Sequence, residues 1–164
     1  MTAREGYMPT TGGLRLHYRA VGEGAQAVVI PGDALLGADL GPLADHRFVI
    51  FYDMRNRGRS DEILDSTQIG FEQEISDLEA VRQYFHLDQM QLVGWSYMGA
   101  VAALYASRHP NYVTRLLLVG PINPRQGPGP RGVQGRVVRR TAAHVLASVA
   151  ALGWPGRASR GRRA

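Results

Sequence analysis

The chain has 164 residues, the length of a single compact domain, and a formal net charge of +5. It has no cysteine, so a disulfide framework and a thiolate metal site are excluded. The sequence shows neither a secretory signal at its start nor an apolar stretch long enough to span a bilayer. We therefore expect a cytoplasmic protein, with no metal ion and no cofactor.

The charges divide the chain into two parts. All 14 acidic residues lie at or before Asp88, all 19 basic residues are arginines, and nine of these arginines follow Pro124. The sequence beyond Pro124 is rich in Arg, Gly and Pro, a composition too poor in apolar residues to form a packed core. We therefore predict a folded region over residues 1–124 and a flexible tail over residues 125–164, with only a weak helix at about 136–152.

Hydrophobic periodicity predicts an alternation of strands and helices. Residues 14–21 alternate between apolar and polar side chains after a Thr-Gly-Gly turn, so we expect the chain to open with a hairpin. Short apolar runs predict further strands, at residues 27–30, 48–52, 90–93 and 115–119. Apolar spacings of three and four predict a helix at 70–86, and an Ala-rich segment that ends before Pro110 predicts another at 96–108. This alternation indicates an α/β fold with a mostly parallel sheet and flanking helices.

The strongest chemical signal lies where the predicted strand at 90–93 runs into the predicted helix at 96–108. The sequence there is Gly94-Trp95-Ser96-Tyr97-Met98-Gly99, close to the G-x-S-x-G pattern of a nucleophile elbow. Small residues flank the serine of such an elbow because its backbone is strained. Gly94 provides the first of them, whereas Met98 stands in the place of the second and Gly99 follows one position later. The alternative interpretation is that Ser96 is only a helix N-cap.

Two further segments agree with the elbow in order and spacing. They read Val28-Val29-Ile30-Pro31-Gly32-Asp33 and Phe51-Tyr52-Asp53-Met54-Arg55-Asn56-Arg57-Gly58-Arg59-Ser60-Asp61. Together with the elbow, they resemble the α/β-hydrolase family of serine hydrolases over about residues 6–124. Pro31 stands where the family usually has His, and Asn56 where it usually has Gly, a change that a left-handed turn tolerates. The resemblance implies an α/β-hydrolase sheet truncated after about its sixth strand.

The resemblance also implies a mechanism. Ser96 would attack the carbonyl carbon of an ester, amide or related acyl substrate, and main-chain N–H groups would hold the oxyanion. One donor would be Tyr97, and the other Asp33 or Ala34. We expect the Asp33 carboxylate to point away from the oxyanion, which favours Ala34 as the second donor.

The acid and base that the serine needs are missing from the expected positions. In this family they follow the serine as Asp or Glu and then His. No Asp or Glu follows Ser96 in this sequence, and the only later histidines are His109, at a predicted helix end, and His144, in the tail. We therefore expect little or no turnover by this chain.

The tail leaves other interpretations open. The chain could be a noncatalytic fold fragment or a partner-binding protein whose basic tail binds anions. Few aromatic residues accompany the arginines and no nucleic-acid motif is present, which argues against binding of nucleic acid or an anionic membrane. The abrupt change at Arg125 is also what a GC-rich coding sequence read in a shifted frame would give. We expect the strand at 115–119 to be an unprotected sheet edge, which favours self-association.

The remaining candidates have structural interpretations. An alternative to the family loop is a phosphate-binding cluster, formed by Asp53, Arg55, Arg57 and Arg59. We expect His17 and His46 at the surface or in loops. Trp95 and Tyr97 flank the predicted nucleophile, where they either line an acyl pocket or pack beneath the elbow.

Overall fold

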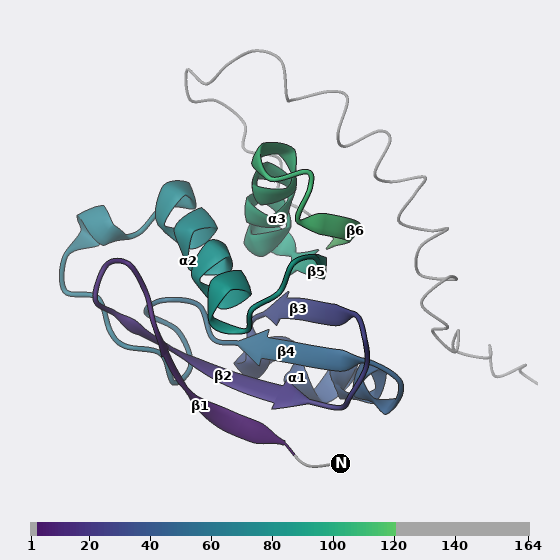
Figure 1. Cartoon of the computed structure of the whole chain (residues 1–164). Helices are drawn as coiled ribbons and strands as arrows, with labels where there is room; N and C mark the ends of the chain where they lie inside the picture. Colours follow the sequence, from purple (N-terminus) through teal and green to yellow (C-terminus); the bar gives the residue numbers. More distant parts are fainter. Residues whose placement is uncertain (1–2, 121–164) are drawn as a thin grey trace, which may run out of the picture.

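A computed structural model describes residues 3–120, in which six strands form one mixed sheet with helices on both faces (Figure 1). The strands are β1 (Arg4–Pro9), β2 (Arg15–Val21), β3 (Ala27–Pro31), β4 (Phe48–Tyr52), β5 (Met90–Trp95) and β6 (Val113–Val119). The helices are α1 (Asp33–Leu40), α2 (Phe71–Tyr84) and α3 (Ser96–Arg108), with short 3-10 helices η1 (Gly41–Asp45) and η2 (Ser66–Gln68). The predicted tail and its weak helix lie outside the described residues.

The sheet has the order β1-β2-β4-β3-β5-β6. The opening hairpin of β1 and β2 is confirmed, and β2 continues antiparallel to β4. The other four strands are parallel to one another, as the alternation of strands and helices predicts. The chain leaves β3 for β4 on one side of it and later returns as β5 on the other side. Such a switch point opens a crevice at the carboxyl ends of the strands, where α/β proteins bind ligands.

Two hydrophobic layers hold the sheet. Helices α2 and α3 cover one face, and α1 with η1 covers part of the other (Figure 1). Adjacent residues of β3 project into opposite layers, since Val29 packs toward α2 and α3 whereas Val28 and Ile30 pack on the α1 side. All five residues of β3 are buried, which confirms the prediction of a strand covered on both faces.

Helix α1 is an element that the sequence analysis did not predict. It contains Gly37 in its interior and has no side-chain hydrogen bond at its N-terminus, so the usual helix signals are weak. Tertiary contacts explain the glycine. A Cβ atom at position 37 would lie 2.6 Å from Arg19 Nη2 and would also overlap the Asp33 carboxylate, so glycine leaves room for an ion pair.

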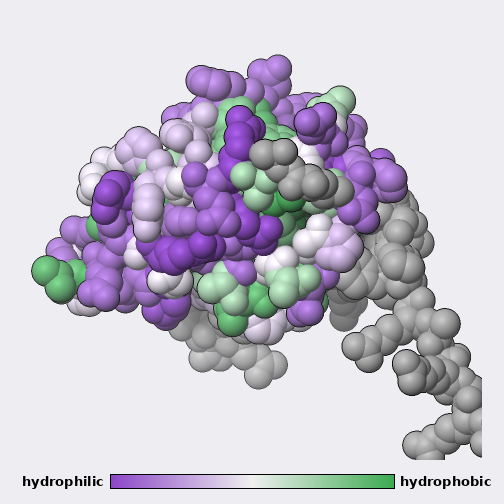
Figure 2. All heavy atoms as spheres, turned by 90° about the horizontal axis from the view of Figure 1, so that it is seen from below, coloured by the Kyte–Doolittle hydropathy of each residue, from purple (hydrophilic) through white to green (hydrophobic). Residues whose placement is uncertain are grey.

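The surface seen from below is largely hydrophilic, with hydrophobic residues in separate small patches (Figure 2). Arginine and acidic side chains form ion pairs between distant segments, such as Arg15 with Asp61 and Arg108 with Glu72. Among the helices of residues 3–120, none combines the length and the apolar composition that crossing a bilayer requires.

Candidate active site

Ser96 lies at the sharp turn between β5 and α3. Its φ angle is +52°, in the left-handed region that a non-glycine residue rarely occupies. The N-cap of α3 is Trp95, and no side chain caps this helix end. Ser96 is therefore not the N-cap that the alternative interpretation required. Strain of this kind at a strand-to-helix turn is the backbone geometry of a nucleophile elbow.

Gly94 makes this turn sterically possible. A Cβ atom there would lie 2.6 Å from the carbonyl oxygen of Met98 and 2.8 Å from the Cα atom of Gly99. Met98 stands where the G-x-S-x-G pattern has its second glycine. The core accommodates it, because its side chain is buried between the sheet and the helices. The elbow thus needs its first glycine, whereas a large apolar residue fits in the place of the second.

The loop after β3 provides main-chain donors near the same edge of the sheet. Gly32 adopts a φ of +94° just before α1 begins. The N–H group of Ala34 donates to Asp53 Oδ1 at 3.0 Å and is therefore committed to a carboxylate. The N–H groups of Asp33 and Tyr97, in the first turns of α1 and α3, have no hydrogen-bond partner among residues 3–120. They are available to an incoming anion.

Asp53 organises the loop after β4. Its buried carboxylate also accepts the N–H group of Arg59 at 3.1 Å. A Cβ atom at Gly58 would lie 2.3 Å from this carboxylate, and Gly58 has a positive φ of 56°. Asn56 adopts a φ of 57°, as predicted for a residue in the place of the family's glycine.

Arg55 and Arg59 of this segment bind acidic side chains of the protein itself, whereas Arg57 donates to the carbonyl oxygen of Asn56 at 2.9 Å. Arg55 forms a two-pronged pair with Asp77, at 2.6 and 2.7 Å. Arg59 and Arg19 both bind the buried Asp33 carboxylate, at 2.9 Å for Arg59 Nη2 and 3.1 Å for Arg19 Nε. These pairs account for the cluster without a phosphate, and they neutralise the charge of Asp33 beside the candidate oxyanion donors.

The histidines do not meet at the elbow. His17 was expected at the surface or in a loop, but it lies on β2 and is only 4% exposed, because the hairpin folds it between Tyr7 and Asp53. His46 is exposed, as expected. His109 is the C-cap of α3 and stacks between Tyr105 and Tyr112, at the opposite end of the helix from Ser96. His144 lies outside the described residues.

The aromatic residues on either side of Ser96 differ in burial. Trp95 lies at the carboxyl end of β5, and 42% of its surface is exposed. Tyr97 is half-buried and packs against Phe71 of α2, with the ring centroids 5.0 Å apart. Glu74, in the same first turn of α2 as Phe71, is a buried acid. The sequence analysis missed its burial because an acid in a first helical turn is favoured by the helix dipole at the surface as well.

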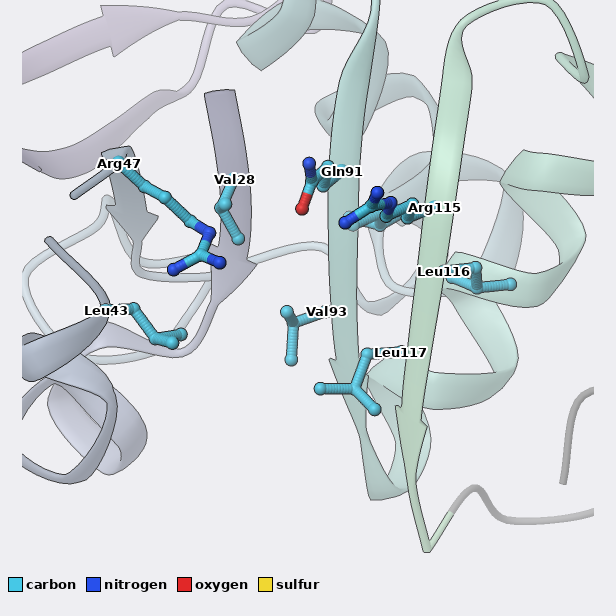
Figure 3. Close-up of a pocket in the computed structure, with 9 residues that line it drawn as sticks. Val28, Leu43, Arg47, Gln91, Val93, Arg115, Leu116 and Leu117 are labelled. Atoms are coloured by element: carbon cyan, nitrogen blue, oxygen red, sulfur yellow. The ribbon is translucent and has the colours of Figure 1, made fainter. Parts of the chain in front are cut away.

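A small groove of about 10 Å³ lies on the α1 face of the sheet, away from the elbow. Figure 3 shows Val28, Val93 and Leu117 projecting toward it from three neighbouring strands, with Arg47 and Arg115 at its rim. Its lining includes none of the elbow or oxyanion-loop residues. Within residues 3–120, no group of three acidic or histidine side chains is placed to hold a metal ion.

Comparison with known proteins agrees with this geometry. The family model described as the alpha/beta hydrolase fold matches residues 32–150. Proline iminopeptidase of Heyndrickxia coagulans is 31% identical over 126 residues, covering 71% of this chain and 43% of its own length. Serine hydrolase BPHL of Mus musculus is 31% identical over 118 residues, covering 66% of this chain and 40% of its own.

Solved structures show the same relationship. A crystal structure of an alpha/beta hydrolase from Novosphingobium aromaticivorans superposes with a TM-score of 0.65 at 27% identity, covering 71% of this chain and 43% of that one. A proline iminopeptidase-related protein from Thermus thermophilus has a TM-score of 0.68 at 21% identity, covering 74% of this chain and 45% of that one, and shows the shared fold. The chain spans less than half the length of these relatives. Because the family model matches well over half of its residues, this chain belongs to the α/β hydrolase fold family.

Proposed function

We propose that this protein is a serine hydrolase whose nucleophile is Ser96 and whose substrate is an ester, an amide or a related acyl compound. The observation that carries the proposal is the φ of +52° at Ser96, directly between β5 and α3. A protein tolerates such strain where it serves a function, and here it lifts a hydroxyl to the carboxyl edge of the sheet. The family relationship to named hydrolases supports the same reaction class.

The oxyanion would form between two helix N-termini. As Ser96 Oγ attacks the carbonyl carbon, the carbonyl oxygen gains negative charge and needs donors already in position. The main-chain N–H groups of Asp33 and Tyr97 suit this role because neither has another partner in the described part of the chain. Ala34 is the weaker candidate, since its N–H group already donates to Asp53.

Exposed apolar side chains beside the elbow support an apolar acyl or leaving group. Trp95 precedes the nucleophile, and its strand partner Val119 on β6 is 46% exposed. Leu35, which follows the oxyanion loop, is also exposed. Trp95 and Val119 lie at the carboxyl ends of β5 and β6, and Leu35 lies in the first turn of α1, which follows β3. Two curated relatives carry the name proline iminopeptidase and two the name serine hydrolase BPHL, which keeps a peptide substrate within the proposal.

Turnover by the 164-residue chain alone is expected to be low. A triad nucleophile needs a base, and the base needs an orienting acid. The sequence has no acidic residue after Asp88. The 13-residue helix α3 places His109 about 20 Å from Ser96 along its axis. Without a base to accept the Ser96 Oγ proton, we expect both the attack by Ser96 and the later release of the acyl group to be slow.

Labelling with a fluorophosphonate probe tests the proposal. The probe phosphonylates activated serine hydroxyls, and mass spectrometry of the digest identifies the modified residue. Because no base activates Ser96, we expect slow label on Ser96, loss of that label in Ser96→Ala, and retention in the matched control Ser107→Ala. Ser107 lies on the same helix, is exposed, and donates its hydroxyl to the carbonyl oxygen of Leu104. Equal labelling of Ser107 and Ser96, or none at Ser96, would favour the noncatalytic alternative.

A further inference from the structure

Glu74 is a buried carboxyl group that the proposed reaction at Ser96 does not use. It lies in the first turn of α2 and is only 4% exposed. Its Oε2 atom is buried without a hydrogen-bond partner among the described residues, and so is the hydroxyl oxygen of Tyr52 on β4. Buried polar atoms nearly always have partners, so two unpaired atoms in one interior region need an explanation.

Arg55, the nearest cation to Glu74, forms its ion pair with Asp77. Arg55 binds both carboxylate oxygens of Asp77 and donates to the carbonyl oxygen of Gln68 at 2.7 Å. Glu74 therefore has no ion pair in the described region, although Arg55 and Arg57 are close enough to act on it at a distance. Burial, the largest cause, and the Asp77 carboxylate raise the pKa of Glu74, the two arginines oppose the rise, and the resulting pKa is about 7. A carboxyl group in this setting is largely neutral below pH 7.

The contact between α2 and α3 links Glu74 to the elbow. Phe71, in the same turn of α2, packs its ring against Tyr97, the residue directly after Ser96. Burial, and after it the negative charge of Glu74, raises the pKa of both Tyr97 and Tyr52. The electric field of the carboxylate therefore reaches the turn that carries the nucleophile and one of its candidate oxyanion donors.

We propose that Glu74 is a positioning residue of the elbow that carries a proton while Ser96 is reactive, and that its ionisation slows the attack by Ser96. This inference rests on the proposed role of Ser96 as the nucleophile. A neutral carboxyl group is compatible with the interior between α2, β4 and α3, whereas a carboxylate there is poorly solvated. An ionised Glu74 would also place negative charge next to Tyr97, where the oxyanion develops.

Glu74 has a pKa near neutral in this interior. The charged and titratable groups that face it are Asp77 on α2, Arg55 and Arg57 after β4, Tyr52 on β4, and Tyr97 on α3. Burial also raises the pKa of Asp77, and its ion pair with Arg55 opposes that rise. The Arg57 guanidinium donates to the carbonyl oxygen of Asn56 at 2.9 Å. The raised pKa values keep both tyrosine hydroxyls neutral between pH 5 and 9.

The first test follows the Tyr97 main-chain amide by NMR in ¹⁵N-labelled protein between pH 5 and 9. We expect its chemical shift to titrate with a midpoint near pH 7 in the wild type and to lose this titration in Glu74→Gln, which keeps the shape and removes the charge. The matched control is Glu72→Gln in the same helical turn, where Glu72 is exposed and paired with Arg108 at 2.6 Å. It should titrate like the wild type. If Glu74→Gln does not fold, Glu74→Met supplies a neutral side chain of similar length.

An unchanged titration in both Glu74 variants, or no titration in the wild type, would overturn the inference. The second test measures the rate of Ser96 phosphonylation against pH. We expect Glu74→Gln and wild type to react equally at pH 5.5, and Glu74→Gln to react about threefold or more faster at pH 8.5. If Ser96 is labelled but Glu74→Gln and wild type react at the same rate at pH 8.5, the role of Glu74 is refuted while the proposed function stands. Absence of Ser96 labelling in every variant refutes the proposed function, and the inference with it.

Discussion

The buried carboxylate of Asp53 accepts a hydrogen bond from the main-chain N–H group of Ala34 at 3.0 Å. The bond joins the loops after β3 and β4 across neighbouring parallel strands. It also leaves the preceding N–H group, that of Asp33, as the one without a partner in the described region. The Asp53 side chain, at the end of β4, thus determines that the Ala34 N–H group has a partner and that the Asp33 N–H group does not in the described region.

Asp53→Asn tests this selection. The amide side chain retains one acceptor oxygen, so either the Ala34 or the Arg59 N–H group loses its partner, and the charge opposite Arg59 disappears. We expect the free energy of unfolding to fall by about 1–3 kcal/mol and the rate of Ser96 labelling to fall with it. The measurements are urea denaturation and fluorophosphonate labelling. The control Asp65→Asn alters an exposed carboxylate that accepts the Thr67 N–H group, and it should change stability much less.

Gly94→Ala should prevent the elbow from forming correctly. The new methyl group would meet the Met98 carbonyl oxygen at 2.6 Å, which the backbone relieves only by moving the turn. We expect a loss of about 1–3 kcal/mol in stability and loss of Ser96 labelling. Gly41→Ala is the control, because its φ is −49° and a Cβ atom there meets nothing within 4 Å. A Gly94→Ala protein with normal labelling would contradict the steric role assigned to this glycine.

Ser96→Gly should make the protein more stable, although it removes the proposed nucleophile. Glycine adopts a φ of +52° without the steric penalty that serine carries there. We expect a gain of about 1 kcal/mol in the free energy of unfolding, measured by thermal or urea denaturation. Ser107→Gly, within the same helix, should instead destabilise by about 0.5–1 kcal/mol. A destabilised Ser96→Gly would show that the turn is not strained.

Glu79 should contribute stability that acid removes. Hydrogen bonds from Arg82, Tyr105 and Gln83 lower the pKa of Glu79 to about 2, with Arg82 the largest cause. Because the folded-state pKa lies below the usual value of 4.5, the contribution is complete above pH 4.5 and disappears as the pH falls toward 2. Its size is at most about 3 kcal/mol. Stability of Glu79→Gln should therefore depend less on pH between 4.5 and 2 than that of the wild type, in urea denaturations at each pH.

The edge strand β6 leads us to propose that the chain self-associates. Within the described sheet it pairs only with β5, and several of its residues are exposed. Strand edges of this kind pair with other chains. We expect the apparent mass in light scattering to rise with protein concentration, and Val119→Lys to reduce the rise by adding charge at the strand end. A monomer at all concentrations would contradict this proposal.

Local signals in the sequence were sufficient for most of the secondary structure. Apolar runs predicted β4 at its exact bounds, and the Ala-rich segment before Pro110 predicted α3 at its exact bounds, because burial on one or two faces leaves a periodic pattern. The position of Ser96 at a strand-to-helix junction followed from the same patterns. Helix α1 was not predicted, because the glycine in its interior lowers helix propensity. Gly37 is needed there to leave room for Arg19 of β2, which is distant in the sequence.

The sequence by itself determined where the elbow lies and which turn residues it needs, because a sharp turn between two periodic segments depends on nearby residues. Only the tertiary structure decided that Ala34 donates to Asp53, that His17 is buried, and that the Glu74 carboxyl group is buried with one oxygen unpaired among residues 3–120. Each of these depends on contacts between segments far apart in the chain, whose approach sets burial and hydrogen bonding. The order of apolar and polar residues along the chain does not show which distant segments come into contact.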